Sequence, residues 1–135
     1  QGVKFIDAHG DKTAFEILRA LRKGNFVVFV LDQFMGRPFG IETSFFGRKT
    51  GTAYGLALFY LRTRSPVLPI YCFEGPLGKL HIVCEPPLKL ESLVTSDQNK
   101  TVAVLTQKFN DVIEQAVRKH PKDWMWVHRR WKDFE

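Results

Sequence analysis

The sequence predicts an α/β fold with a mostly parallel sheet flanked by helices. Two apolar runs, residues 25–31 and 67–73, are rich in β-branched and aromatic side chains. In both runs, the residues that would point to one face of a sheet and those that would point to the other are apolar. This pattern is typical of strands covered on both faces. Segments with a helical spacing of apolar residues alternate with these runs, as they do in α/β domains. The chain has 135 residues, the size of one domain.

The first predicted helix and strand lead directly to a polar residue. Residues 13–23 are predicted to form a short amphipathic helix, because Thr13 and Glu16 have the spacing of a capping box and a glycine follows the last turn. The apolar run 25–31 comes next and ends abruptly at Asp32. In α/β folds, ligands collect at the carboxyl ends of such strands.

The middle of the chain is predicted to contain a loop, a helix and a hairpin. Three glycines and a proline mark residues 34–50 as a loop. Residues 52–64 are predicted to form an apolar helix that ends before Pro66. The strand predicted at 67–73 is followed by a turn and an alternating strand at 79–85, which predicts a hairpin.

The last part of the chain combines a helix with an aromatic and basic cluster. Residues 102–119 have the spacing of one long amphipathic helix, and residues 124–132 are dense in tryptophan and arginine. That cluster could stack on single-stranded nucleic acid, rest on anionic lipid, or pack its rings while its arginines hold phosphates. Ordinary core packing is an equal alternative. His128 and Asp133 match an H-x4-D spacing, which we interpret as coincidence.

Composition and charge narrow the classes of function. Hydrophobic residues are 44% and charged residues 25% of the chain, which excludes a disordered protein. The 20 Lys and Arg residues exceed the 14 Asp and Glu residues, giving a net charge of +6 that favours acidic partners such as phosphates, anionic headgroups or acidic proteins. No apolar run approaches the roughly 20 residues that cross a bilayer. Cys72 and Cys84 lack the spacing of metal ligands, so no metal site is expected.

Two sets of polar residues are candidates for a site. Asp32 could take part in catalysis, or it could cap a helix or pair with an arginine of the loop, and the pattern leaves both open. Arg37, Arg48 and Lys49 precede the predicted helix at 52–64, where free N–H groups and the helix dipole favour a phosphate. A solvated basic loop explains these three residues equally well.

Several short blocks, taken in order, resemble one family. Together they resemble the late acyltransferases of lipid A biosynthesis, the lauroyl and myristoyl transferases of Gram-negative bacteria. The resemblance extends along essentially the whole chain, and its most distinctive part is the block that ends W-x-H-R-R-W-K. The blocks are Leu31-Asp32-Gln33, Phe45-Phe46-Gly47, Thr50-Gly51-Thr52-Ala53, Pro66-Val67-Leu68-Pro69 and residues 121–132.

The resemblance implies a fold, a reaction and a location. The fold would be glycerolipid-acyltransferase-like, and the protein would act at the cytoplasmic face of the cell inner membrane. It would transfer a fatty acyl chain from acyl carrier protein to a hydroxyl of a lipid A precursor, without a cofactor. In the family, the histidine of an H-x4-D/E motif deprotonates the hydroxyl and the carboxylate orients that histidine. We find no such motif before Asp32, where the family carries it. We therefore expect residues 1–135 to be the C-terminal part of a single acyltransferase domain, incomplete at the N-terminus and inactive alone.

The resemblance also implies roles for individual residues. Asp32 matches the family's D-Q aspartate and is expected to support catalysis. The expected substrate-binding residues contact phosphates of the lipid A precursor or of the carrier's phosphopantetheine; they are Gln33, Arg37, Lys49, Arg129 and Arg130. The expected partners are acyl carrier protein, the lipid A precursor and the membrane surface, with no nucleic acid. The alternatives are a basic nucleic-acid-binding module that uses the Trp/Arg-rich C-terminus, and a related acyltransferase with another glycolipid acceptor.

Overall fold

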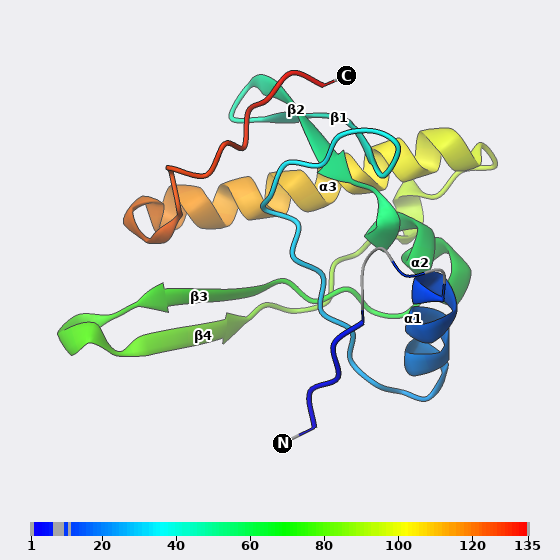
Figure 1. The fold of residues 1–135 in the computed structure, drawn as a ribbon, viewed down its shortest axis with the longest axis horizontal. Coiled ribbons are helices and arrows are strands. Elements are labelled where there is room, and N and C mark those ends of the chain that lie inside the picture. Colours follow the sequence, from blue (N-terminus) through cyan, green and yellow to red (C-terminus); the bar gives the residue numbers. More distant parts are fainter. Residues whose placement is uncertain (1, 7–9, 11, 135) are drawn as a thin grey trace.

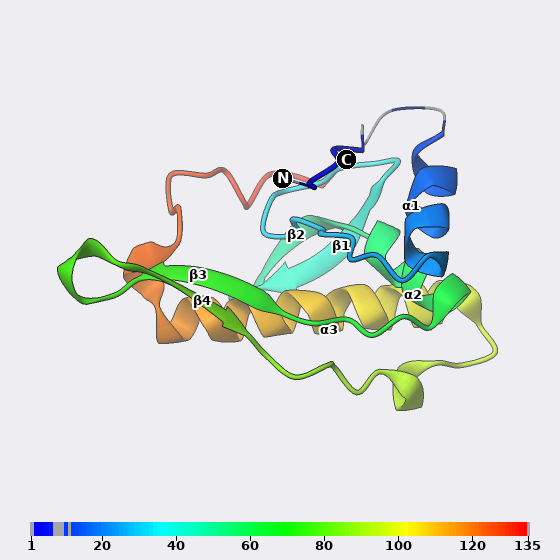
Figure 2. The same ribbon diagram turned by 90° about the horizontal axis from the view of Figure 1, so that it is seen from below.

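Two antiparallel hairpins lie along one long helix (Figure 1). The computed structural model describes residues 2–6, 10 and 12–134. In Figure 1 the β1–β2 hairpin is drawn above the long helix and the β3–β4 hairpin below it, and in the turned view of Figure 2 both hairpins are drawn on the same side of that helix. The elements, in order, are α1 (Thr13–Arg22), β1 (Gly40–Phe45), β2 (Arg48–Ala53), α2 (Gly55–Thr63), β3 (Ile70–Glu74), β4 (Leu80–Cys84) and α3 (Gln98–Lys119), with short 3-10 turns at Pro76–Gly78, Glu91–Leu93 and Pro121–Asp123.

The predicted parallel sheet is wrong. In the described part of the chain, each of the two sheets has two strands, and both pairs are antiparallel. The run 25–31, predicted to be a buried strand, is extended but joins neither sheet, and residues 26–34 make no backbone hydrogen bond to a described residue. Its side chains alternate between half-buried and exposed, with Phe26, Val28 and Val30 at 90%, 81% and 70% exposure. Residues 25–31 therefore have the composition of a strand, but none of the strands that the structure describes pairs with them.

The predicted loop at 34–50 is also wrong in part, because it contains β1 and the start of β2. The two-residue turn between these strands is Phe46-Gly47, and both residues have positive φ angles of 52° and 71°. Positive φ at both central residues is the geometry of the turns that favour hairpins, and glycine adopts it at no steric cost. Thr43 and Phe45 are buried on one face, while Glu42 and Ser44 are exposed.

Three predicted helices and the second hairpin are confirmed, with shifted ends. α1 matches the helix predicted at 13–23, but its N-cap is Lys12, and the hydroxyl of Thr13 donates to Gly10 O at 2.7 Å in place of the predicted capping box. α2 begins three residues later than predicted because residues 52 and 53 belong to β2. α3 begins earlier than predicted, since the Asp97 carboxylate caps it by accepting from Lys100 N at 3.0 Å.

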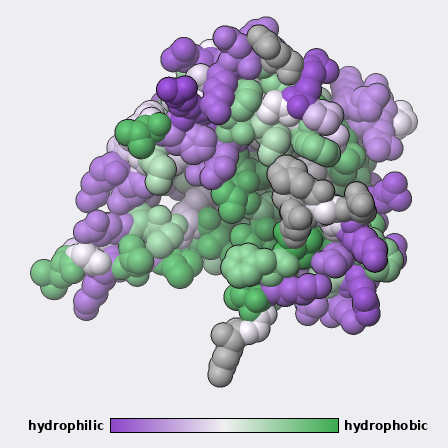
Figure 3. Space-filling view, viewed as in Figure 1, coloured by the Kyte–Doolittle hydropathy of each residue, from purple (hydrophilic) through white to green (hydrophobic). Residues whose placement is uncertain are grey.

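The core has an apolar part and a polar part. The apolar cluster joins α2, α3 and the turn before α3; its buried members are Ala57, Tyr60, Leu90, Val102, Leu105 and Phe109. The polar part lies between the β1–β2 hairpin and α3, and its members include Thr43, Thr50, Thr52, Asn110 and Arg130. Among the helices that the structure describes, none is both long and apolar enough to span a membrane. Apolar side chains also cover the β3–β4 hairpin on the outside of the molecule (Figure 3).

Candidate functional site

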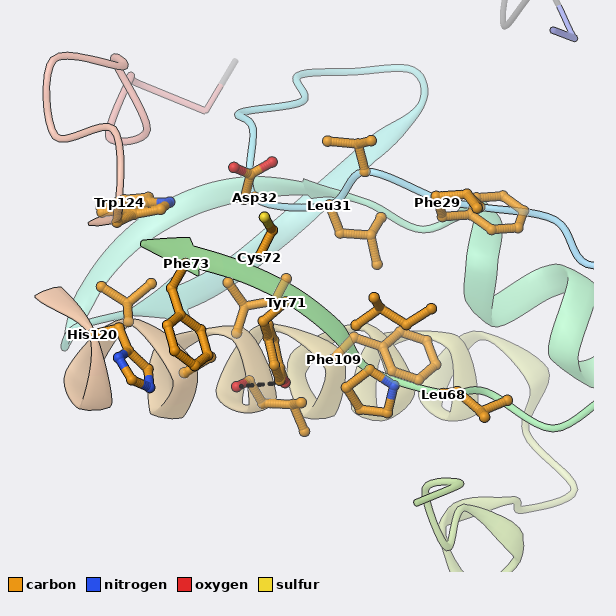
Figure 4. Close-up of a pocket in the computed structure, with 18 of the residues that line it drawn as sticks. Phe29, Leu31, Asp32, Leu68, Tyr71, Cys72, Phe73, Phe109, His120 and Trp124 are labelled. Atoms are coloured by element: carbon orange, nitrogen blue, oxygen red, sulfur yellow. Dashed lines mark hydrogen bonds between the residues drawn. The ribbon is translucent and has the colours of Figure 1, made fainter. Parts of the chain in front are cut away.

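An apolar groove of about 560 Å³ runs between the extended segment, β3 and α3 (Figure 4). The extended segment contributes residues 28–32, and β3 with the chain before it contributes residues 67–73. The floor comes from the face of α3 between Phe109 and Val117, and His120 continues it just after the helix ends. Apolar or aromatic side chains make up most of this lining, which is typical of a pocket for an apolar ligand.

A few polar groups line one end of the groove. Asp32 lies at the end of the extended segment, in the part of the groove that Trp124 also lines, and its Oδ1 is buried with no hydrogen-bond partner among the described residues. The carboxylate of Asp123 accepts a hydrogen bond from Glu74 N at 3.1 Å. The ring of His120 stacks on that of Phe73, with 3.9 Å between the ring centroids. Within residues 2–6, 10 and 12–134, no three His, Cys, Asp or Glu side chains are grouped as metal ligands.

The hydroxyl of Tyr71 faces α3 inside the groove (Figure 4). It donates to Val112 O at 3.4 Å, and burial, together with the charge of Glu85, raises the pKa of this phenol above its ordinary value of 10.0. Tyr71 is therefore a neutral hydrogen-bond donor at physiological pH. Because this neutral hydroxyl is bonded to a backbone carbonyl of α3, it adds no charge to the apolar floor of the groove.

Arg130 is completely buried beneath β2. Its Nη1 donates to Thr50 Oγ1 at 3.1 Å and to Gly51 O at 2.5 Å, and its Nη2 donates to Thr52 Oγ1 at 2.7 Å and to Asn110 Oδ1 at 2.8 Å. Burial lowers the pKa of Arg130 to about 10, against the opposing effect of the negative charge of Asp32. The guanidinium therefore remains charged at neutral pH although no solvent reaches it.

The other residues predicted for substrate binding lie apart from the groove. Gln33, Arg37, Lys49 and Arg129 are exposed, and none of them lines it. Lys49 pairs with Glu42 at 3.0 Å across the β1–β2 hairpin, and the guanidinium of Arg37 lies 5.2 Å from the ring centroid of Phe134. The structure thus brings Asp32 into the groove, buries Arg130 and leaves the remaining four at the surface.

The aromatic cluster at the C-terminus packs against the β1–β2 hairpin. The ring of Phe45 lies 5.4 Å from Trp124 and 5.8 Å from Trp131, and Trp131 Nε1 donates to Phe45 O at 3.0 Å. Trp126 is half exposed. Core packing, one of the open interpretations of these rings, is what the structure shows for Trp124 and Trp131. In the described part of the chain, no hydrogen bond or ion pair joins His128 to Asp133.

Sequence reasoning did not identify the polar residues that surround Arg130. Asn110 lies in α3, and its Nδ2 donates to Ser44 O at 2.7 Å and to Thr43 Oγ1 at 3.3 Å. The available signal was the asparagine next to Phe109, within the apolar stripe of an amphipathic helix. A buried amide in that position requires partners, and here it joins α3 to β1.

The chain matches a known protein family over nearly all of its length. The family model described as bacterial lipid A biosynthesis acyltransferase matches residues 1–133. None of the curated proteins compared with the chain matches it. The matched residues include both hairpins, the three α-helices and the groove with Asp32 at its end.

Proposed function

The chain belongs to the bacterial lipid A biosynthesis acyltransferase family, and we propose that its groove holds the fatty acyl chain that the enzyme transfers. The observation that carries the proposal is the apolar groove with a carboxylate, Asp32, at one end. Each CH₂ of an acyl chain that leaves water for such a lining gains about 0.8 kcal/mol. The free energy of binding of a saturated chain lying along α3 would therefore increase mainly with the number of its CH₂ groups. Asp32 would lie at the end of the groove near the reacting carbonyl.

The reaction in this proposal is an acyl transfer from acyl carrier protein to a lipid A precursor. The acceptor hydroxyl oxygen forms a bond to the carbonyl carbon of the thioester, the C–S bond breaks, and the thiol of the carrier leaves with a proton. The acceptor hydroxyl gives up its proton to the histidine of an H-x4-D/E pair, as the family resemblance implies. Asp32 supports the site by its charge, and the chemistry uses no cofactor.

Surface cations of the chain would contact the phosphates of the two substrates. Arg37, Lys49 and Arg129 are exposed and would form charge-assisted hydrogen bonds, for which Lys49 would have to exchange its partner Glu42 for a phosphate. Gln33, beside Asp32, would be a neutral donor. Arg130 is different, because its two terminal nitrogens already donate to four protein acceptors. In this proposal, therefore, the first three cations contact phosphate and Arg130 supports the protein.

The proposed location is the cytoplasmic face of the inner membrane. The support is the apolar surface of the β3–β4 hairpin, where Leu77 is 94%, Leu80 74% and Ile82 75% exposed, together with the net charge of +6. Exposed apolar side chains near positive charge favour contact with anionic lipid. The packed tryptophans favour the acyltransferase over a nucleic-acid-binding module, because Trp124 and Trp131 contact Phe45 and are not free to stack on bases.

A groove-filling variant tests the acyl-chain site. Ala116 lines the groove from α3, whereas Ala103 lies on the exposed face of the same helix. We expect Ala116→Phe to shorten the preferred acyl chain and to reduce transfer of long chains, in the intact gene product assayed with a series of acyl carrier protein thioesters. The matched control Ala103→Phe should leave the chain-length profile unchanged. Identical profiles for the two variants would remove the groove from the proposal.

A further inference from the structure

Arg130 carries a fixed positive charge into the interior. Its guanidinium is held by four acceptors from two elements, β2 and α3, and in return its backbone oxygen accepts from Thr50 Oγ1 at 2.5 Å. All of these acceptors are neutral. No carboxylate of the described residues lies within ion-pair distance of Arg130. A buried cation with neutral partners requires a compensating charge nearby, because hydrogen bonds replace only part of its hydration.

The segment that carries Asp32 docks on the strand that holds Arg130. Met35 N donates to Gly51 O at 3.1 Å, and this same carbonyl accepts from Arg130 Nη1. The approach is so close that a Cβ on Gly51 would overlap Met35 O, and so would a Cβ on Gly40. Glycines at these two positions therefore allow the chain just after Asp32 to lie directly on the β1–β2 hairpin.

Asp32 supplies the charge that Arg130 lacks. Its carboxylate opposes the effect of burial on the pKa of the guanidinium. One carboxylate oxygen, Oδ1, is buried with no hydrogen-bond partner among the described residues, and so is Nε of Arg130. The attraction between the two groups acts through a protein interior that screens charge less than water does. The two residues are thus coupled by charge without a direct hydrogen bond.

We propose that Arg130 is a positioning residue that holds the Asp32 carboxylate at the end of the acyl groove. The inference rests on the proposed function of Asp32 in acyl transfer. The more constrained member of the pair is Arg130, which is bound to two elements, whereas Asp32 lies on the extended segment, which pairs with no described strand. Loss of the positive charge would leave Asp32 held only through its neighbours in the chain, by the packing of Leu31 on the apolar core and by the docking of Met35 on β2.

A double-mutant cycle in the intact gene product tests the coupling. We expect Asp32→Asn and Arg130→Met each to lower kcat about tenfold, with KM for the acyl donor nearly unchanged, which corresponds to a coupling within the range seen for interacting residues. In the double variant, kcat should be no lower than in Asp32→Asn alone. Losses that multiply to about a hundredfold would overturn the inference, because independent sites are additive in free energy.

Two further variants separate positioning from stability. Val102→Ala removes apolar contacts in the core, at a residue that neither binds Arg130 nor lines the groove, and keeps both charges, so it should lower Tm and leave kcat unchanged. Arg130→Lys keeps the charge and should retain most of kcat although it also lowers Tm; a lysine variant as slow as Arg130→Met would overturn the inference. Full activity of Asp32→Asn would instead contradict the proposed function of Asp32. The two failures are therefore distinguishable.

Discussion

The two hairpins are similar in length but have opposite surroundings. β1–β2 is joined to α3 and to the C-terminal segment by side-chain hydrogen bonds, among them Phe46 N to Glu114 Oε2 at 2.6 Å and Gln107 Nε2 to Ser44 O at 2.9 Å. β3–β4 has few such bonds, and every residue of β4 is exposed. The more polar hairpin is thus part of the interior, while the more apolar hairpin remains at the surface.

The difference follows from what each hairpin offers its neighbours. The buried face of β1–β2 carries hydroxyls that pair with one another, as Thr43 and Thr52 do at 2.7 Å, and with Asn110 and Arg130. Satisfied polar networks of this kind fix one geometry. β3–β4 presents apolar side chains, many of which have no such directional partner in the described part of the chain, so β3 lines the groove and β4 stays exposed.

The largest expected effect comes from breaking the buried hairpin at its centre. Phe45 has 0% exposure and packs on Trp124 and Trp131, so Phe45→Ala should reduce the free energy of unfolding by about 3–5 kcal/mol. Ile82→Ala on the exposed hairpin is the control, with an expected change within about 0.5 kcal/mol. Urea unfolding followed by tryptophan fluorescence measures both. Equal losses would contradict the assignment of the two hairpins to interior and surface.

Replacing either of two glycines by alanine should change the free energy of unfolding, but with opposite signs. Gly51→Ala should destabilise the protein by about 1–3 kcal/mol, because its methyl group would overlap Met35 O and displace the segment after Asp32 from β2. Gly55 begins α2, and a methyl group added there would meet no atom within 4 Å, so Gly55→Ala should stabilise by about 0.5–1 kcal/mol. Thermal unfolding compares the two. Unchanged stability of the Gly51→Ala variant would show that the segment after Asp32 does not pack closely on β2.

The sequence predicts the helices better than the sheets, for a physical reason. The stripe that contains Val102, Leu105 and Phe109 is a local periodicity, and α3 follows from it. The β3–β4 hairpin was also predictable, because its turn residues lie between two apolar runs. Residues 25–31 can form part of a sheet only if a strand from elsewhere in the chain pairs with them. Local composition does not show whether such a partner is present. β1–β2 was missed because its inward positions, apart from Phe45, are threonines and glycines.

In the candidate site, too, one residue was predictable from local sequence and another was not. Asp32 was predictable as the polar residue that ends an apolar run, and the structure places it in the groove. Arg130 has the composition of a surface residue, since arginine is rarely buried. Its burial depends on residues 50–52 and Asn110 meeting in space, about eighty and twenty positions away along the chain. Only the folded structure brings these groups together.

A smaller effect is expected for the pH dependence of the buried hairpin. Burial raises the pKa of Glu114, but the hydrogen bond from Phe46 N–H and the contacts with Arg118 outweigh it, so the pKa lies below its ordinary value of 4.5. A depressed pKa contributes stability above the pKa of the unfolded chain, and this contribution is lost as pH falls through the folded pKa. The wild type should therefore lose more stability than Glu114→Gln between about pH 6 and pH 3. Urea unfolding across that range, with the exposed Glu91→Gln as control, measures the difference. Parallel curves would show that the carboxylate bond to β1–β2 is unimportant.

The smallest effect on stability is expected at the exposed hairpin, where the consequence should lie in binding. Leu80→Ser and Ile82→Ser together should change the free energy of unfolding by no more than about 0.5 kcal/mol, because both side chains already contact water in the folded protein. If this hairpin meets the membrane as we propose, the double variant should bind phosphatidylglycerol-containing vesicles more weakly than the wild type in a sedimentation assay. The control is Ala103→Ser on the exposed face of α3, which should bind as the wild type does. Unchanged vesicle binding by the hairpin variant would mean that lipid contacts another face of the protein.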